Sequence, residues 1–189
     1  MLTLAPLAAA LAASTIWWCE AAFAHAPENL CEAQMTRAAQ SFAIPIGILY
    51  SVGLTETGHN GALSPYDMNV DGRAVHSDSL KDALARFEYE RAHGARFIDI
   101  GCMQINHHFH AQNFRSLVDM FDPEQNVRYA AGFLKRLREQ EGSWTLAVAR
   151  YNAGPDNDGA QRRYVCAVIE QMVASGTGSW TPAARTFCK

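Results

Sequence analysis

The amino-acid sequence predicts a mainly α-helical protein with one small, irregular β-hairpin. Apolar residues recur every three or four positions in several segments between residues 30 and 172, which is the spacing of amphipathic helices. Residues 61–76 break this pattern with turn-forming Gly, Pro, Asn and Asp, and the pair Asp71-Gly72 is a hairpin signal. The 189 residues suffice for one domain with a substantial core.

The chain begins with a segment typical of an export signal. Residues 2–18 carry no charge, and Ala22-Phe23-Ala24 offers small residues to a signal peptidase. We expect residues 1–24 to be a signal peptide cleaved before His25, and residues 25–189 to form the mature domain. An uncleaved anchor is the alternative, although the apolar run is marginally short of the roughly 20 residues that span a bilayer.

Cysteine usage agrees with export to an oxidising compartment. Four cysteines follow the leader, namely Cys31, Cys102, Cys166 and Cys188. An even number favours two disulfides, and four cysteines allow three pairings that the sequence does not distinguish. We take Cys31–Cys102 and Cys166–Cys188 as the expected pairs because the second closes a short C-terminal loop.

The first two helices of the mature chain are expected before the hairpin. The first covers roughly Leu30–Phe42, and its inward face is Cys31, Met35, Ala38 and Ala39. The second starts near Pro45, which suits a first helical position, and stops near Gly58. Its inward face is expected to be Ile46, Leu49, Tyr50, Gly53 and Leu54.

Glu56 continues the apolar face of the second helix. An acid at the inner end of an apolar stripe loses hydration, and this loss raises its pKa. A carboxyl that stays protonated near neutral pH can serve as the general acid that cleaves a glycosidic bond. The plainer alternative is that Glu56 caps the helix or forms an ion pair there.

Helical signals resume after the hairpin. Ser77-Asp78 is expected to cap a third helix from about Ser79 to His93, ended by Gly94. Its expected inward residues are Leu80, Ala83, Leu84 and Phe87. Residues 97–106 then form a compact stretch whose periodicity is ambiguous.

Three more helices are expected in the second half of the chain. Asp122-Pro123 is a helix start, since Asp caps and Pro fits the first position; that helix should run to about Gln140. Gly142-Ser143 is expected to separate this helix from a short one that ends at residues 152–155. Asp158 is expected to cap the last helix. The expected inward residues are Val127, Ala130, Ala131, Leu134 and Leu137; Trp144, Ala147, Val148 and Tyr151; and Tyr164, Val165, Val168, Ile169 and Met172.

Charge and motif content argue against several other functions. The net charge of -3 is too small to indicate nucleic acid or an anionic membrane surface as a partner. His107, His108 and His110 lack the spacing of a zinc site, so a solvated or packed cluster is the better interpretation. No phosphate-binding loop and no Ser-His-Asp nucleophile is visible. We therefore expect neither a metal nor a cofactor.

Three motifs, in order, resemble those of the soluble-lytic-transglycosylase-like (SLT) family. Residues 53–58, Gly-Leu-Thr-Glu-Thr-Gly, resemble the catalytic glutamate motif. Residues 101–106, Gly-Cys-Met-Gln-Ile-Asn, are similar to the family's Gly-Leu-Met-Gln-Ile, and residues 150–154, Arg-Tyr-Asn-Ala-Gly, to its Ala-Tyr-Asn-Ala-Gly. The similarity extends from about Leu30 to Tyr164.

This resemblance implies a lysozyme-like fold that cuts the β-1,4 bond between N-acetylmuramic acid and N-acetylglucosamine. The muramic acid's own 6-hydroxyl would attack the anomeric carbon and leave a 1,6-anhydro ring. Glu56 is implied as the single catalytic acid, which protonates the leaving oxygen and then takes the hydroxyl proton. Substrate contacts are implied for Thr57, Met103, Gln104, Asn106, Tyr151 and Asn152.

The roles of these contacts follow from their chemistry. The Gln104 amide can both donate and accept, which suits an N-acetyl group or the bridging oxygen. The Tyr151 hydroxyl could orient Glu56 or the muramyl sugar, and Asn152 could stabilise a turn or touch the acetamide. For each of these three residues, the alternative is a purely structural role in the core or in a turn.

Three positions depart from the family motifs. Thr57 replaces a serine and keeps its hydroxyl, Cys102 replaces an apolar residue and is expected in a disulfide, and Arg150 replaces an alanine. Arg150 could meet a carboxylate of the stem peptide, although a solvated helix face is the simpler expectation.

Two other functions stay open. One is a hydrolytic muramidase, since goose-type lysozymes share the fold and the single glutamate; Asp99 and Asp71 are the nearest candidates for a second acid. The other is a non-catalytic, peptidoglycan-binding assembly factor. The predicted signal peptide indicates the periplasm, and we expect a monomer there. The family resemblance implies glycan strands, and components of a secretion, conjugation or flagellar apparatus, as partners.

Overall fold

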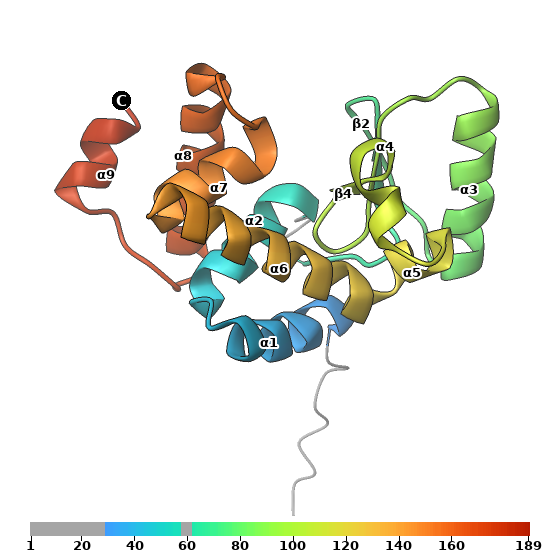
Figure 1. Cartoon of the computed structure of the whole chain (residues 1–189), viewed down its shortest axis with the longest axis horizontal. Helices are drawn as coiled ribbons and strands as arrows, with labels where there is room; N and C mark the ends of the chain where they lie inside the picture. The colour runs from blue at the N-terminus through green and yellow to red at the C-terminus, as the bar shows by residue number, and fades with distance from the viewer. Residues whose placement is uncertain (1–28, 58–61) are drawn as a thin grey trace, which may run out of the picture.

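The computed structural model describes residues 29–57 and 62–189, so the predicted signal peptide and the Gly58 helix stop lie outside the described residues. The chain forms two lobes (Figure 1). The helical lobe comprises α1 (Leu30–Phe42), α2 (Ile46–Thr57), α6 (Pro123–Glu141), α7 (Trp144–Ala153) and α8 (Asp158–Ala174). The second lobe comprises a small sheet with α3 (Leu80–Ala92), α4 (His107–His110), the 3-10 turn η1 (Ala111–Asn113) and α5 (Leu117–Phe121). The predicted mainly α-helical class is confirmed.

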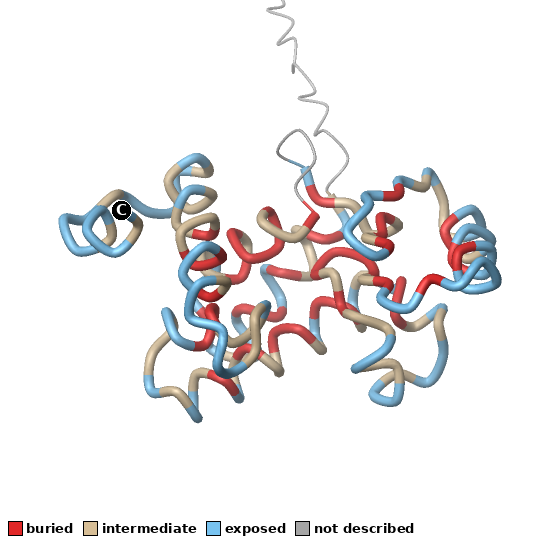
Figure 2. The backbone as a smooth tube through the Cα atoms, turned by 90° about the horizontal axis from the view of Figure 1, so that it is seen from above, coloured by how far each residue is buried: buried red, intermediate tan, exposed pale blue. Residues whose placement is uncertain are grey.

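The second helix is the centre of the helical lobe. It packs against α1 on one side and α8 on another, while α6 packs against α1 and α7. Figure 2 shows the buried residues running along the middle of the molecule. Because α2 has neighbours on several sides, its buried face is wider than the single stripe we predicted: Ser51 and Val52 are buried, whereas Ile46 is exposed.

The predicted hairpin is the start of a four-stranded antiparallel sheet. Strands β1 (Met68–Val70) and β2 (Arg73–Val75) pair across Asp71-Gly72, and both turn residues have positive φ, as a two-residue hairpin loop requires. The ambiguous stretch 97–106 supplies β3 (Ile98–Ile100) and β4 (Ile105–Asn106), giving the order β2-β1-β3-β4. Strands this short carry too little periodicity to be recognised from sequence.

Two predicted helix starts were wrong by one or two residues. Ser79, and not Ser77-Asp78, caps α3 by accepting the N–H of Asp82. Asn157, and not Asp158, caps α8 by accepting the N–H of Ala160. In both segments neighbouring Ser, Asp and Asn residues are all competent caps, and only the path of the chain selects one.

The helix over residues 158–174 is also not the last one. The short α9 (Pro182–Phe187) follows it and lies outside the core at one end of the molecule (Figures 1 and 2). On α8, Tyr164, Val165 and Val168 are buried as expected. The last two predicted core positions, Ile169 and Met172, are only half-buried because fewer elements cover this end of the helix.

Both expected disulfides form. Cys31–Cys102 joins the start of α1 to the turn after β3, across 71 residues. Cys166–Cys188 ties the C-terminal segment to α8 across 22 residues. Two disulfides fit a protein that works outside the cytoplasm. Among the described residues, no helix is both long and apolar enough to cross a membrane.

Candidate active site

Glu56 lies in the last turn of α2, at the boundary between the lobes. Two cavities meet at its side chain. One, of about 170 Å³, borders the sheet and includes Asn69 and His76. The other, of about 680 Å³, borders α7 and includes Asp99 and Tyr151. Glu56 and Gln104 line both cavities, so together the cavities form a groove with the acid near its middle.

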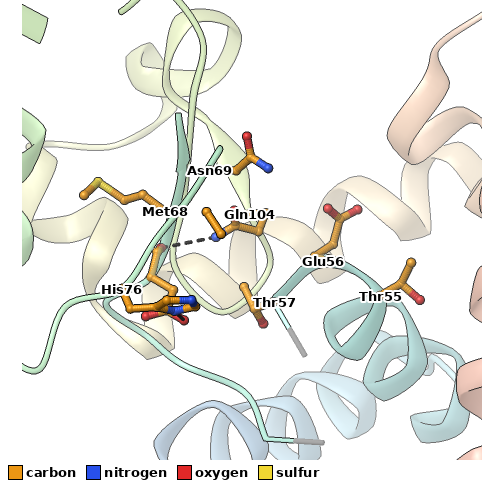
Figure 3. A pocket seen from close by; sticks show the side chains of 9 residues that line it. Thr55, Glu56, Thr57, Met68, Asn69, His76 and Gln104 are labelled. Atoms are coloured by element: carbon orange, nitrogen blue, oxygen red, sulfur yellow. Dashed lines mark hydrogen bonds and ion pairs between the residues drawn. The ribbon is translucent and has the colours of Figure 1, made fainter. Parts of the chain in front are cut away.

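The view into the smaller cavity shows how the acid is presented. Thr55, Glu56 and Thr57 lie at the end of α2, opposite Asn69 and Gln104 on the other wall (Figure 3). The groove is therefore bounded by the helical lobe on one side and the sheet on the other. An elongated ligand lying in it would pass Glu56 at an interior point of its length.

The environment of Glu56 raises its pKa from 4.5 to about 7. Burial is the main cause, since a charged carboxylate loses hydration there. The negative field of Asp99 raises the pKa further, while hydrogen bonds from Tyr164 and Asn152 lower it. The carboxyl is thus protonated in a substantial fraction of molecules at neutral pH, as a general acid must be.

Tyr164 holds Glu56 in place, a role that the sequence did not reveal. Its hydroxyl donates to Oε1 of Glu56 at 2.5 Å, and the tyrosine comes from the buried face of α8. The apolar spacing of the sequence predicts only a core position for Tyr164. The one available signal was a phenol within an apolar stripe, because a buried tyrosine hydroxyl needs a partner.

The Tyr151 hydroxyl contacts a different group. It donates to the backbone oxygen of Met103 at 2.9 Å, so the phenol that is hydrogen-bonded to Glu56 is that of Tyr164 and not that of Tyr151. Burial raises the pKa of both phenols well above 10. Both therefore stay neutral donors over the whole range in which Glu56 titrates.

Asn126, a fully buried residue of α6, holds the turn that carries Met103 and Gln104. The Asn126 amide accepts from the N–H of Met103 and donates to the oxygens of Ile100 and Met120. Gly101 is needed here because its φ is +74° and a Cβ would lie 2.9 Å from the Asn126 amide nitrogen. The Met103 side chain is fully buried, and Met103 lines neither of the two cavities, so its predicted substrate contact is not seen in the groove lining.

Gln104 adopts a left-handed backbone conformation, with φ of 44°. Its amide nitrogen donates to the backbone oxygens of Asp67 and Gly101, at 3.2 and 3.0 Å. Both donor hydrogens have partners in the protein, so the side-chain oxygen is the group that Gln104 can offer a ligand. That oxygen suits an N–H donor such as an acetamide.

Thr57 ties the end of α2 to the Cys102 turn. Its buried hydroxyl lies 3.2 Å from the backbone oxygens of both Gly53 and Cys102. Gly53 packs closely on α1, since a Cβ there would lie 2.3 Å from the terminal methyl of Met35. The helix that carries the acid is therefore held tightly against its neighbours.

Asp99 and Asn106 form a polar pair on the wall of the larger cavity. The Asn106 amide donates to Asp99 at 2.6 Å, and its oxygen caps α4 by accepting the N–H of Phe109. Burial raises the pKa of Asp99, and the Asn106 hydrogen bond lowers it. Asn106 thus holds Asp99 in the groove that contains Glu56.

The three histidines considered as metal ligands each pack against an aromatic ring. His107 packs on Phe87, His108 on the ring of Phe97 and His110 on Tyr129. No group of three His, Cys, Asp or Glu suited to a metal occurs in the part of the chain that the structure describes.

Arg150 lines the larger cavity. It pairs with Glu141 at 3.2 Å, and its guanidinium also donates to the backbone oxygen of Gly154. Asn152 is exposed beside it on the same wall. The end of α7 therefore contributes polar groups to the groove.

Comparison with known proteins assigns the chain to a family. A protein-family model described as the transglycosylase SLT domain matches residues 36–171. Searches of curated proteins and of solved structures returned no match. Because the family match covers well over half of the chain and the acid, its groove and the helical fold agree with it, the protein belongs to the transglycosylase SLT domain family, whose lysozyme-like members act on peptidoglycan.

Proposed function

We propose that the protein is a peptidoglycan lytic transglycosylase that leaves a 1,6-anhydro-N-acetylmuramic acid end. The observation that carries the proposal is Glu56, a half-buried acid with a pKa of about 7 at the meeting point of two cavities. Sugars on either side of the scissile bond would occupy the two cavities. The bridging oxygen would then lie next to the acid.

One carboxyl suffices for this reaction. Protonated Glu56 gives its proton to the oxygen that leaves with N-acetylglucosamine, and the C1–O bond breaks. The 2-acetamido group of the muramic acid stabilises the anomeric carbon, as in substrate-assisted glycosidases. The 6-hydroxyl then forms the new C1–O bond, and ionised Glu56 takes the proton from it. Water is neither consumed nor released.

The surrounding residues support each step. Tyr164 orients the Glu56 carboxyl through its 2.5 Å hydrogen bond. The Gln104 oxygen, held by the two donor contacts of its amide nitrogen, can accept from an acetamide N–H. Asn152 contacts Glu56 and also lines the groove. We propose that Thr57, Met103, Asn106 and Tyr151 act by shaping the turn and the groove wall.

Product analysis tests the proposal. Purified sacculi digested by the mature protein should yield anhydro-ended muropeptides by mass spectrometry. Glu56→Gln should lower the rate by at least about 100-fold, the scale of general acid catalysis. Glu139→Gln is the matched control, since Glu139 is an exposed α6 residue paired with Lys135. Clearance of sacculi by Glu56→Gln at the wild-type rate would show that Glu56 is not the catalytic acid, and failure of the wild-type protein to clear sacculi would leave only a binding or assembly function.

A hydrolytic muramidase is the second candidate, and Asp99 favours it. This carboxyl lines the same cavity as Glu56 and could orient a water molecule on the muramic acid, as the second acid of an inverting pair does. Reducing ends in place of anhydro ends would identify this reaction. The single-acid reaction is preferred because Asp99 is already engaged by Asn106 at 2.6 Å.

We also propose that the protein is exported to the periplasm, where it opens the wall for an envelope-spanning machine. The two disulfides and the apolar residues 2–18 support export. N-terminal sequencing of the periplasmic protein should begin at His25. If a secretion, conjugation or flagellar apparatus depends on wall cleavage, the wild-type gene should restore its assembly in a deletion strain and Glu56→Gln should not.

A further inference from the structure

An exposed aromatic cluster, defined as Phe97, His108 and Phe109, lies beside the groove. The Phe97 and Phe109 rings stack with centroids 5.8 Å apart, and His108 meets both edge-on. Phe109 is 57% exposed and Phe97 is 39% exposed. Exposed aromatic surface of this kind is unfavourable in water, and a cluster of it commonly marks a binding site.

Phe109 connects this cluster to the groove. It lines the larger cavity together with Glu56 and Tyr151. Its position is well defined, since its backbone N–H is bonded to Asn106, the residue that caps α4 and holds Asp99. The ring therefore belongs to a capped helical turn at the wall of the same cavity that contains the acid.

We propose that Phe109, supported by Phe97 and His108, is a distal sugar subsite that stacks on an N-acetylhexosamine ring of the bound strand. This inference rests on the proposed function and extends it to sugars beyond the scissile bond. The apolar C–H face of a pyranose matches a neutral aromatic face in size and polarity. His108 and Phe97 keep the Phe109 ring in place so that little conformational entropy is lost on binding.

Continuity with the groove favours a sugar over a protein partner as the occupant. A glycan strand that passes Glu56 within the larger cavity meets Phe109 at the cavity wall. A contact with a sugar beyond the scissile bond should be the same in the ground and transition states. It should therefore lower the Michaelis constant without changing the maximal rate.

Binding to the inactive protein tests the subsite directly. Chito-hexaose is titrated into Glu56→Gln protein, with and without Phe109→Ala. The second change should weaken binding about three- to tenfold, the range for a lost aromatic contact. Phe187→Ala is the matched control because Phe187 is a similarly exposed phenylalanine on α9, at 44%. Phe109→Trp should restore binding, and thermal unfolding should show that all the variants are folded.

The active protein gives a second readout. On soluble glycan strands, Phe109→Ala should raise KM by a similar factor at unchanged kcat, and it should leave the anhydro product unchanged. Equal hexaose affinity with and without Phe109 would overturn the subsite and leave the cluster for a protein partner. A fall in kcat at constant KM would also overturn it, by placing the ring at the reacting sugars. If Glu56→Gln protein binds no saccharide, the proposed function itself fails.

Discussion

The Tyr164 hydroxyl donates a hydrogen bond to Oε1 of Glu56 at 2.5 Å, although 108 residues separate the two in the chain. The bond joins the buried face of α8 to the end of α2, and these two helices pack together in the helical lobe. It has two effects on the acid. It orients the carboxyl, and it partly offsets the rise in pKa that burial produces.

Tyr164→Phe should therefore move the pH dependence of the reaction. Loss of the phenol removes an interaction that stabilises the ionised carboxylate, so the pKa of Glu56 should rise further. The alkaline limb of kcat should shift to higher pH, while the maximal kcat falls roughly tenfold or more because the acid is less well oriented. The measurement is kcat from pH 5 to 9.

A purely structural role for Tyr164 would lower activity without moving the limb. Tyr50→Phe is the control because Tyr50 makes a similar hydrogen bond, to Glu32 at 3.2 Å. It should leave both the limb and the rate unchanged.

Asp99→Asn should shift the alkaline limb of the pH dependence of kcat to lower pH. Asp99 raises the pKa of Glu56 through its negative charge, so neutralising it should lower that pKa. Less Glu56 would then be protonated at alkaline pH, and the rate at pH 8 should fall by roughly two- to fivefold. The substituted amide oxygen can still accept from Asn106, which keeps the pair intact.

Asp78→Asn supplies the charge control, since Asp78 is exposed and does not contribute to the Glu56 shift. An unchanged pH profile for Asp99→Asn would show that its charge does not act on Glu56. Reducing ends made by the wild type and abolished in this variant would instead assign Asp99 to a hydrolytic reaction.

Glu56→Gln should make the protein more stable at alkaline pH. The folded pKa of about 7 exceeds the ordinary value of 4.5, so the native state holds a proton that the unfolded state has lost between these values. Stability from this group falls as pH rises through that window. The Glu56→Gln variant has no buried carboxyl to ionise. Its free energy of unfolding at pH 8 should therefore exceed that of the wild type by about 1–3 kcal/mol.

Urea unfolding at pH 4, 6 and 8 measures the difference. It should grow with pH and vanish near pH 4, where both states are protonated. Glu139→Gln should show no such trend. A stability difference that is constant with pH would contradict the raised pKa of Glu56.

The two disulfides should differ in their effect on catalysis. Cys31–Cys102 joins α1 to the turn next to Met103 and Gln104, whereas Cys166–Cys188 holds only the peripheral α9. Replacing either pair by alanine should lower the free energy of unfolding, by about 3–4 kcal/mol in the chain-entropy model. Loss of the first pair should also lower kcat, because the turn at Gln104 loses one attachment. Loss of the second should leave kcat on soluble strands unchanged.

Much of the fold was predictable because the signals are local. Apolar spacing placed α1, apolar spacing together with the Asp122-Pro123 start placed α6, and Asp71-Gly72 placed the hairpin. Glu56 could be recognised because it continues an apolar face and stands within a family motif. The short strands β3 and β4 could not, because a few residues do not separate a strand period from a helical one.

The sequence by itself determined the helical class, the candidate acid and the number of cysteines available to pair. Only the tertiary structure decided which groups surround that acid. The partners of Tyr164, Asp99 and Asn126 could not be identified locally, since each acts on a residue from a distant part of the chain. The pKa of Glu56 is set by burial, by the hydrogen bonds of Tyr164 and Asn152 and by the charge of Asp99. These exist only when α2, α7, α8 and the sheet are packed together.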